Sequence, residues 1–265
     1  MKYLRMFFLH SQYAFAERGR SFVWFLYSII PPGIFILFWI GALKSQGGNI
    51  EGWNFSKITS YYFLLTVDSE MLIAHIEEDI SREDIQEGRL TGYLLKPFSY
   101  YLIKFFEEIP WRLLQGSFGI VLCIAFVLVF GNFFTFSANT LIIALSISTA
   151  ILAFMLSFAF KTVLGLMAFW LTDTNGLFQL FEAVALIFGG FIVPITLLPS
   201  FVEHLSVFLP FAYMAYYPVI AFQGQLTVLE LAHVILLQAA WIIGFVLLYK
   251  WIWFEGRKKY TAVGQ

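Results

Sequence analysis

Long uninterrupted hydrophobic stretches dominate the pattern of this chain. From Leu113 to Phe160 the sequence contains no Asp, Glu, Lys or Arg. A bilayer core about 30 Å thick is crossed by roughly 20 apolar residues in a helix, so this stretch is long enough for two spans. Gly131 and Asn132 form a turn signal near its middle. The pattern predicts a polytopic helical membrane protein.

The other apolar segments extend this pattern to six transmembrane helices in an all-α fold. We expect the spans at about residues 22–43, 58–76, 109–130, 138–160, 176–195 and 228–252. Pro31 and Pro32 lie inside the first span and should kink it, because proline lacks the backbone N–H that a helix interior needs. Residues 161–175 should continue as a helix, either as part of the fourth span or along the inner interface.

Residues 1–20 are predicted to form a helix that lies along the inner membrane surface. Leu4, Phe8 and Phe15 fall on one stripe of this helix, away from its basic side chains. An amphipathic helix with such a stripe can bury it in the headgroup region. The charges and the long apolar run that follows do not fit a cleaved signal peptide, so we expect an uncleaved anchor.

Prolines divide the apolar segment that precedes the last span. Residues 196–227 carry Pro199, Pro210 and Pro218, and Pro194 lies just ahead of them. Each piece between prolines has about ten residues or fewer, which is too short to cross a bilayer. Broken helices at membrane depth occur where protein or a water-filled cavity covers them. We therefore predict a proline-broken, re-entrant extracellular segment that forms an outer cap.

Charged residues make up only 12% of the chain, and the formal net charge is -1. This composition predicts a surface facing membrane lipid and no nucleic-acid partner. Lys and Arg gather near the N-terminus, between residues 77 and 112, and near the C-terminus, whereas residues 162–249 contain none. Because basic flanks stay on the cytoplasmic side, both termini and the loop 77–108 should face the cytoplasm. An even number of spans satisfies this requirement.

The loop 77–108 is the most polar part of the chain. Ser81 is followed three residues later by Asp84, a spacing that resembles a helix capping box, and Gly88 suits a helix end. The pattern predicts a short, charged cytoplasmic helix. Leu94 and Phe98 follow it, and apolar side chains within a charged rim are typical of a partner-binding surface. A solvated loop whose charges only set the topology is the alternative.

Ionisable residues fall inside the second predicted span, namely Asp68, Glu70 and His75. Such groups cost about 2.5–3.5 kcal/mol on membrane-insertion scales, so they usually face a bundle interior or a cavity. Asp68 and His75 are seven residues apart and should share a helix face, whereas Glu70 points elsewhere. Glu182 in the fifth span raises the same question. Contact with a substrate pathway and pairing with neighbouring helices both remain open.

Three sequence motifs that are typical of enzymes are absent from this chain. There is no Gly-x-x-x-x-Gly-Lys-Ser/Thr loop for a nucleotide, no nucleophile elbow and no His-Glu-x-x-His helix. Glu203 and His204 are adjacent, a spacing at which two side chains do not converge on a metal ion. We predict no catalytic residue, nucleotide site, metal site or cofactor in this chain.

Several local motifs occur in an order and spacing that resemble one known family. They are Gly88-Arg89-Leu90 through Leu95-Lys96-Pro97-Phe98-Ser99, Ala168-Phe169-Trp170-Leu171-Thr172-Asp173 with Gly176-Leu177, Gly189-Gly190, Pro194, Leu198-Pro199, Leu209-Pro210-Phe211, Lys258-Lys259-Tyr260 and Gly264. Together with the predicted spans, they make the chain resemble the transmembrane (permease) subunits of bacterial ABC-type-2 exporters, the ABC-2 family. The resemblance extends over nearly the whole chain.

The resemblance implies a single permease domain, residues 1–265, in the bacterial inner (cell) membrane. It implies a separate cytoplasmic ABC ATPase that binds Mg-ATP, and a second permease subunit, identical or related, that completes an outward substrate pathway. The ATPase would dock on a coupling helix in the loop 77–108. The docking side chains expected there are Arg82, Glu83, Asp84, Glu87, Arg89, Leu90, Tyr93 and Leu94.

A stand-alone secondary carrier, channel or membrane-bound enzyme is the alternative function. In that case Asp68, Glu70 and His75 would relay protons or ions through the membrane without an ATPase. An ATPase encoded beside this chain would favour the exporter, whereas gradient-driven transport by the purified chain alone would favour the carrier.

Overall fold

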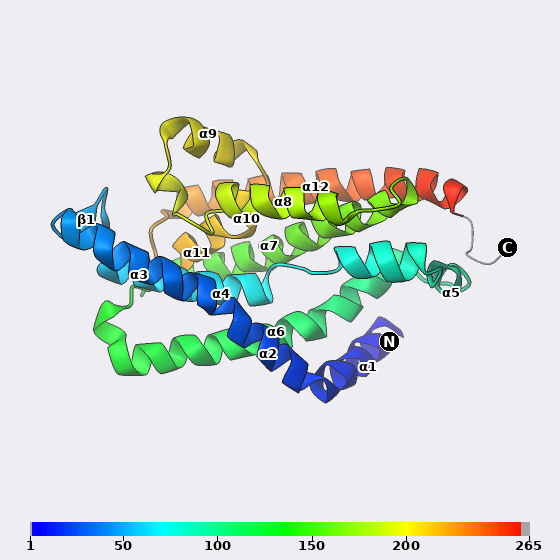
Figure 1. Cartoon of the computed structure of the whole chain (residues 1–265), viewed down its shortest axis with the longest axis horizontal. Helices are drawn as coiled ribbons and strands as arrows, with labels where there is room; N and C mark the ends of the chain where they lie inside the picture. The colour runs from blue at the N-terminus through cyan, green and yellow to red at the C-terminus, as the bar shows by residue number, and fades with distance from the viewer. Residues whose placement is uncertain (1, 261–265) are drawn as a thin grey trace.

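The computed structural model describes residues 2–260, which form an elongated bundle of helices (Figure 1). The N-terminal helices are α1 (Lys2–Ala16), α2 (Arg18–Ser28), α3 (Ile30–Ser45) and α4 (Phe55–Met71). The middle of the chain forms η1 (Asp79–Gln86), α5 (Leu90–Leu94), α6 (Tyr100–Phe130), η2 (Gly131–Phe133), α7 (Thr140–Leu166) and η3 (Met167–Phe169). The last part forms α8 (Asn175–Phe188), η4 (Ile195–Leu197), α9 (Ser200–Phe208), α10 (Phe211–Met214), α11 (Tyr216–Phe222) and α12 (Val228–Lys259). Gly264, which belongs to the motifs that resemble the ABC-2 family, lies outside the described residues.

Four of the described helical segments are long and apolar enough to cross a membrane: Arg18–Ser45, Tyr100–Phe130, Thr140–Phe169 and Val228–Lys259. They contain the predicted first, third and last spans and all but the first two residues of the predicted fourth span. The α7 helix continues to Leu166, so the residues just after the predicted fourth span extend that helix. The α4 and α8 helices are shorter, at 17 and 14 residues. The fold is helical, as predicted, with four segments of transmembrane length.

The first of these segments is broken just before its prolines. Ile29 separates α2 from α3, so Pro31 and Pro32 lie in the first turn of α3. Proline is tolerated there because N–H groups in the first turn have no helical partner. The predicted helix 1–20 is also divided, because Glu17 separates α1 from α2.

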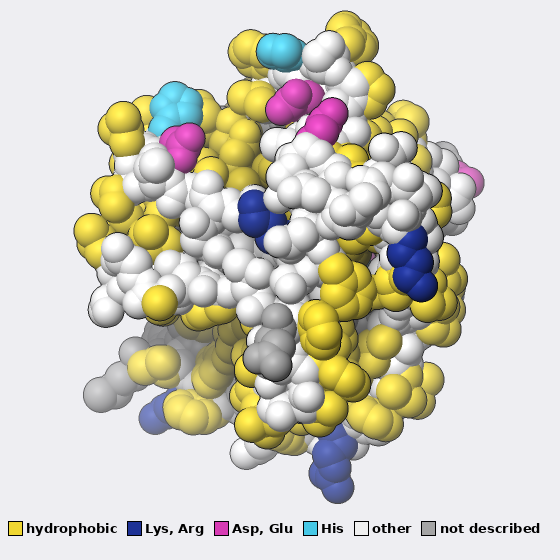
Figure 2. Space-filling view, turned by 90° about the vertical axis from the view of Figure 1, so that its left-hand side faces the viewer, with side chains coloured by type: hydrophobic (Ala, Val, Ile, Leu, Met, Phe, Trp, Pro, Cys, Tyr) yellow, Lys and Arg dark blue, Asp and Glu magenta, His cyan; other side chains and the backbone are white. Residues whose placement is uncertain are grey.

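A short β-hairpin, which the sequence analysis did not predict, connects α3 to α4. Its strands β1 (Asn49–Ile50) and β2 (Trp53–Asn54) pair antiparallel. Figure 1 places this hairpin and α9 at one end of the molecule, the hairpin end, and Figure 2 shows few charged side chains there. The opposite end, which we call the α5 end, holds α1, α5 and the C-terminal end of α12 (Figure 1).

The α4 helix ends at Met71, before the end of the predicted second span. The backbone N–H of His75 donates to Glu108 Oε1 of α6 at 2.9 Å, so a side chain of another helix takes the place of a helical carbonyl. His75 is therefore not part of α4. The prediction that Asp68 and His75 share a helix face is wrong.

The predicted charged helix in the loop 77–108 takes a different form. The η1 segment is π-helical, and Gly88, with a φ of 86°, separates it from α5. Ser81 Oγ lies 2.7 Å from Thr174 Oγ1, and the Asp84 carboxylate binds Lys104. Both side chains are buried. The capping-box prediction for Ser81 and Asp84 is therefore wrong, because each side chain binds a distant partner instead of a nearby backbone N–H.

The proline-rich segment 196–227 forms the short helices η4, α9, α10 and α11. The α10 and α11 helices are buried within the bundle, whereas α9 is largely exposed. Side chains bind carbonyl oxygens of this segment and of the residues between α8 and η4. Tyr61 Oη donates to the Gly190 carbonyl at 2.6 Å, and Gln238 Nε2 donates to the Tyr213 carbonyl at 2.9 Å. Such bonds stabilise an interrupted backbone at membrane depth.

The α7 helix lies at the centre of the packing, where it contacts α12, α11, α10 and η1. Glycines allow the closest approaches. A Cβ added at Gly165 would lie 2.8 Å from Ile80 Cβ, and one at Gly119 of α6 would lie 3.2 Å from Val67 Cα of α4. Small residues at such crossings let transmembrane helices pack closely. Gly165 therefore brings η1 into direct contact with α7.

Candidate functional site

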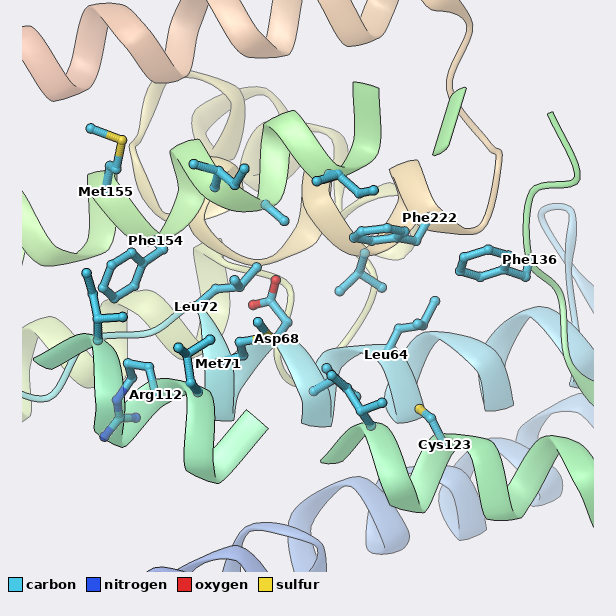
Figure 3. Close-up of a pocket in the computed structure, with 18 of the residues that line it drawn as sticks. Leu64, Asp68, Met71, Leu72, Arg112, Cys123, Phe136, Phe154, Met155 and Phe222 are labelled. Atoms are coloured by element: carbon cyan, nitrogen blue, oxygen red, sulfur yellow. The ribbon is translucent and has the colours of Figure 1, made fainter. Parts of the chain in front are cut away.

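A cavity of about 730 Å³ lies between α4, α6, α7 and α11 (Figure 3). Its walls are mainly apolar and include Met71 of α4, Phe154 of α7 and Phe222 of α11. Asp68 and Arg112 are the only charged side chains among the described lining residues. A cavity of this size and character is typical of sites that bind small molecules.

Asp68 is buried in this wall, with 4% of its surface exposed. Neither carboxyl oxygen has a hydrogen-bond partner among the described residues. Figure 3 shows the carboxyl group projecting from α4 into the cavity, while the guanidinium group of Arg112 points away from it. An isolated carboxyl group in apolar surroundings is costly, because no other group replaces its lost hydration.

Arg112, by contrast, is held by several partners. Its Nε lies 2.9 Å from Glu108 Oε1, and its Nη1 lies 2.9 Å from His75 Nδ1. The same Nη1 donates to the Glu70 carbonyl at 3.3 Å. The guanidinium group of Arg112 thus connects α6 to the last turn of α4 and to the residues that follow α4.

Of the predicted pathway residues, the structure places only Asp68 in the cavity. Glu70 and His75 do not line it, and Glu182 is exposed on α8. Because the Asp68 carboxyl group is unbonded among the described residues and His75 contacts Arg112, no hydrogen-bonded relay joins Asp68 to His75. Arg112 lines the cavity without having been predicted to do so.

A buried ionic network lies at the α5 end. Lys104 Nζ of α6 is 2.8 Å from Asp84 Oδ2 of η1 and 3.3 Å from Glu107 Oε2. Tyr100 Oη donates to the same Asp84 oxygen at 2.5 Å. The side chains of Asp84 and Lys104 are 1% and 6% exposed, so protein shields the pair from water. Removing one partner of such a pair is strongly destabilising, because it leaves an uncompensated buried charge.

Further contacts attach η1 and its flanks to the bundle. Gln86 Nε2 donates to a carbonyl of the connection between η3 and α8 at 2.9 Å, and Tyr260 Oη donates to the Gly88 carbonyl at 3.0 Å. Lys161 of α7 forms an ion pair with Glu77, just ahead of η1. The segment is therefore attached to α6, to α7 and to the residue that follows α12.

The opposite side of this segment is exposed. The side chain of Arg82 is 79% exposed, and Leu95 is 83% exposed. Arg82 Nε lies 3.4 Å from Glu87 Oε1, a surface pair of a kind that contributes little to stability. We refer to the following side chains as the exposed face: Arg82, Glu83, Glu87, Arg89, Leu94 and Leu95.

The predicted docking residues divide between the two sides of the segment. Asp84 and Leu90 are buried, so they are not presented to a partner. Tyr93 is half-buried, its Oη donates to Glu107 at 3.3 Å, and burial raises its pKa to about 12. The remaining predicted residues belong to the exposed face. Lys104 was not among the predicted residues, although its i, i+3 spacing from Glu107 is that of a helical ion pair.

A second hollow of about 440 Å³ adjoins this segment, between Gln86, Trp170 and Lys259. Unlike the cavity, it combines polar and apolar walls. Over the described part of the chain, no group of three or more His, Cys, Asp or Glu side chains could hold a metal ion.

These features define a helical membrane protein with an apolar cavity between its helices and an anchored, charged segment at one end. The sequence matches the family described as ABC-2 family transporter protein over residues 29–264. The chain therefore belongs to the ABC-2 transporter family, which confirms the resemblance. The matched range includes both the cavity and the η1–α5 segment. No curated protein matches the chain.

Proposed function

We propose that this protein is the transmembrane subunit of an ABC exporter. Two permease subunits, identical or related, would enclose the substrate pathway, and a separate cytoplasmic ABC ATPase would bind and hydrolyse Mg-ATP. Membership of the ABC-2 transporter family supports the permease role. The observation that carries the proposal is the η1–α5 segment, which is anchored by the buried Asp84–Lys104 pair and exposed on its other side.

The proposed topology has six passes, of which α4 and α8 supply the two shorter ones. At 1.5 Å per residue, 17 and 14 residues extend about 26 and 21 Å, less than a hydrocarbon core of about 30 Å. Adjoining segments covered by protein would complete both crossings. The basic residues favour the α5 end as the cytoplasmic side of the bacterial inner membrane, with the hairpin end outside.

Movement of the exposed face would reach the cavity through rigid contacts. The Asp84–Lys104 pair joins η1 to α6, and the close approach at Gly165 joins η1 to α7. Both α6 and α7 line the cavity. Closure of the ATPase would therefore shift two walls of the cavity together and change access to it.

Co-purification tests the docking step. A tagged permease is expressed with an ABC ATPase encoded beside it, and the ATPase retained per permease is measured. The double variant Arg82→Glu/Glu87→Arg reverses two of the four charges on the exposed face and keeps opposite signs within the pair. We expect about tenfold less ATPase to be retained, because the reversed charges no longer complement the partner.

The matched control is Glu17→Arg/Arg20→Glu, another exposed pair, 3.5 Å apart, in which Glu17 precedes α2 and Arg20 lies in its first turn. An ATPase that stays bound to the Arg82→Glu/Glu87→Arg variant would contradict the docking proposal, and so would an equal loss in the control. A chain that purifies alone and transports under an ion gradient would indicate the carrier instead.

A further inference from the structure

The carboxyl group of Asp68 is buried among apolar walls that include Leu64 and Val219. Both of its oxygens are unsatisfied among the described residues. Water or a ligand that enters the cavity can supply the missing hydrogen-bond partners and stabilise such a group. The cavity, at about 730 Å³, has room for a molecule of that kind.

The cavity opens sideways between α6 and α7. Ile120 and Ile124 of α6, together with Ile147 and Ile151 of α7, line the cavity and are also exposed at the surface. Both helices have transmembrane length, so this opening faces lipid when they cross the bilayer. A molecule that enters here is dissolved in the membrane, and most of its surface is therefore apolar.

The polar end of such a molecule has to satisfy Asp68. An ammonium group offers three N–H donors and a positive charge, and charge-assisted bonds to a carboxylate are among the stronger hydrogen bonds. The carboxylate would repel an anion, and a pure hydrocarbon would leave it unbonded. Arg112 offers no competing anion site, because its guanidinium group already forms an ion pair with Glu108 and points away from the cavity (Figure 3).

Aromatic rings add to this preference. Phe136 and Phe222 both line the cavity, and their rings are stacked with centroids 5.9 Å apart. Phe154 contributes a third aromatic side chain to the walls. The faces of aromatic rings attract cations and also pack well against alkyl chains.

The geometry points to a binding site for a lipophilic amine. The ligand has one protonated amino group and a long apolar body, enters from the bilayer between α6 and α7, and pairs with Asp68. This inference rests on the proposed exporter function and deepens it, because it names the chemical class of the substrate.

Binding to the purified permease in lipid nanodiscs, without any ATPase, tests the inference. The probe is radiolabelled dodecylamine, and uptake by empty nanodiscs is subtracted to isolate the saturable component. We expect saturable binding of dodecylamine. Dodecanol and dodecanoate have the same chain length but a neutral and a negative head, and we expect them to bind at least about tenfold more weakly.

Three substitutions test whether the amine binds in the cavity at Asp68. Asp68→Asn should weaken amine binding at least about tenfold while leaving dodecanol binding unchanged, because the amide is close in shape to the carboxyl group but has no charge to pair with an ammonium group. Ile151→Trp, at the opening, should reduce binding of both molecules. Glu51→Gln alters an exposed carboxylate at the turn of the β-hairpin, far from the cavity lining, and should change neither.

Absence of saturable amine binding, equal binding of amine and alcohol, or full amine binding by Asp68→Asn would overturn the inference. The assay contains no ATPase, so it is independent of the docking test. Failed amine binding with an intact ATPase complex would overturn the substrate class alone. Intact amine binding without ATPase docking would overturn the exporter proposal and leave the amine site standing.

Discussion

Two regions of this molecule each contain a buried carboxyl group, and the protein surrounds the two groups in opposite ways. At the α5 end, Asp84 is paired with Lys104 and also accepts a hydrogen bond from Tyr100. In the cavity, Asp68 is buried to a similar extent, yet its carboxyl group has no partner among the described residues. The paired group holds one arrangement of η1 against α6. The unpaired carboxyl group of Asp68 lowers the stability of the fold, and a bound ligand can reduce this cost by supplying hydrogen-bond partners.

The largest expected effect comes from breaking the paired region. Lys104→Met leaves the Asp84 carboxylate buried without a counter-charge, which should lower the free energy of unfolding by about 3–5 kcal/mol. Unfolding of the purified permease in detergent measures this change. The double variant Asp84→Leu/Lys104→Met removes both charges and should recover much of the loss.

A Lys104→Met variant as stable as the parent would show that the pair does not anchor η1. The same pair explains why charge reversal at Asp84 is a poor test of docking. A basic side chain at this position would lie against Lys104 and disturb the fold before any partner is involved.

At Asp68, replacement by an apolar side chain should raise the free energy of unfolding, whereas at Lys104 it should lower it. Asp68→Leu replaces an unsatisfied carboxyl group with an apolar side chain of similar size, which should raise the free energy of unfolding by about 1–3 kcal/mol. The same unfolding assay applies. A clear loss of stability in this variant would indicate that Asp68 has a stabilising partner and would remove the contrast between the two regions.

The contact between η1 and α7 tests the comparison further, because it occurs in the region of the Asp84–Lys104 pair and not around Asp68. Gly165→Val would place side-chain atoms against Ile80, and overpacking of this kind costs about 1–3 kcal/mol. If the exporter proposal holds, Gly165→Val should also lower ATP-driven transport by the reconstituted complex, because η1 is displaced from α7. Gly244→Val is the matched control, because a Cβ at Gly244 meets nothing within 4 Å. Equal effects of the two variants would argue against a coupling role for this contact.

The smallest effect concerns the attachment of α1 to the same network. His10 Nε2 lies 3.4 Å from Glu107 Oε1, and burial lowers the pKa of His10 despite the attraction of that carboxylate. The folded pKa is then below the unfolded value of about 6.5, so the unfolded chain binds the proton first as the pH falls. Stability should therefore decrease as the pH drops below about 6.5. Melting temperatures of the parent and of His10→Gln between pH 5.5 and 7.5 measure this slope, and identical slopes would exclude His10 as its source.

The sequence by itself determined the class of fold. A charge-free run such as 113–160 exceeds the length needed to cross a bilayer, and this property depends only on neighbouring residues. The breaks near Pro31 and within residues 196–227 also follow from local chemistry, because proline lacks an N–H. The order of short motifs was sufficient to indicate the ABC-2 family. The exposed face was partly predictable, since charged side chains generally stay in contact with water.

Only the tertiary structure decided which polar groups are buried and what they bind. Ser81 and Asp84 have the spacing of a capping box, yet they bind Thr174 and Lys104, which other parts of the chain supply. A buried polar group must replace its lost hydration, so a distant partner brought close by packing overrides a local pattern. The packing of α4 against α6 and α11, with α7 across the cavity, turns Asp68 into the cavity and leaves its carboxyl group without a partner among the described residues.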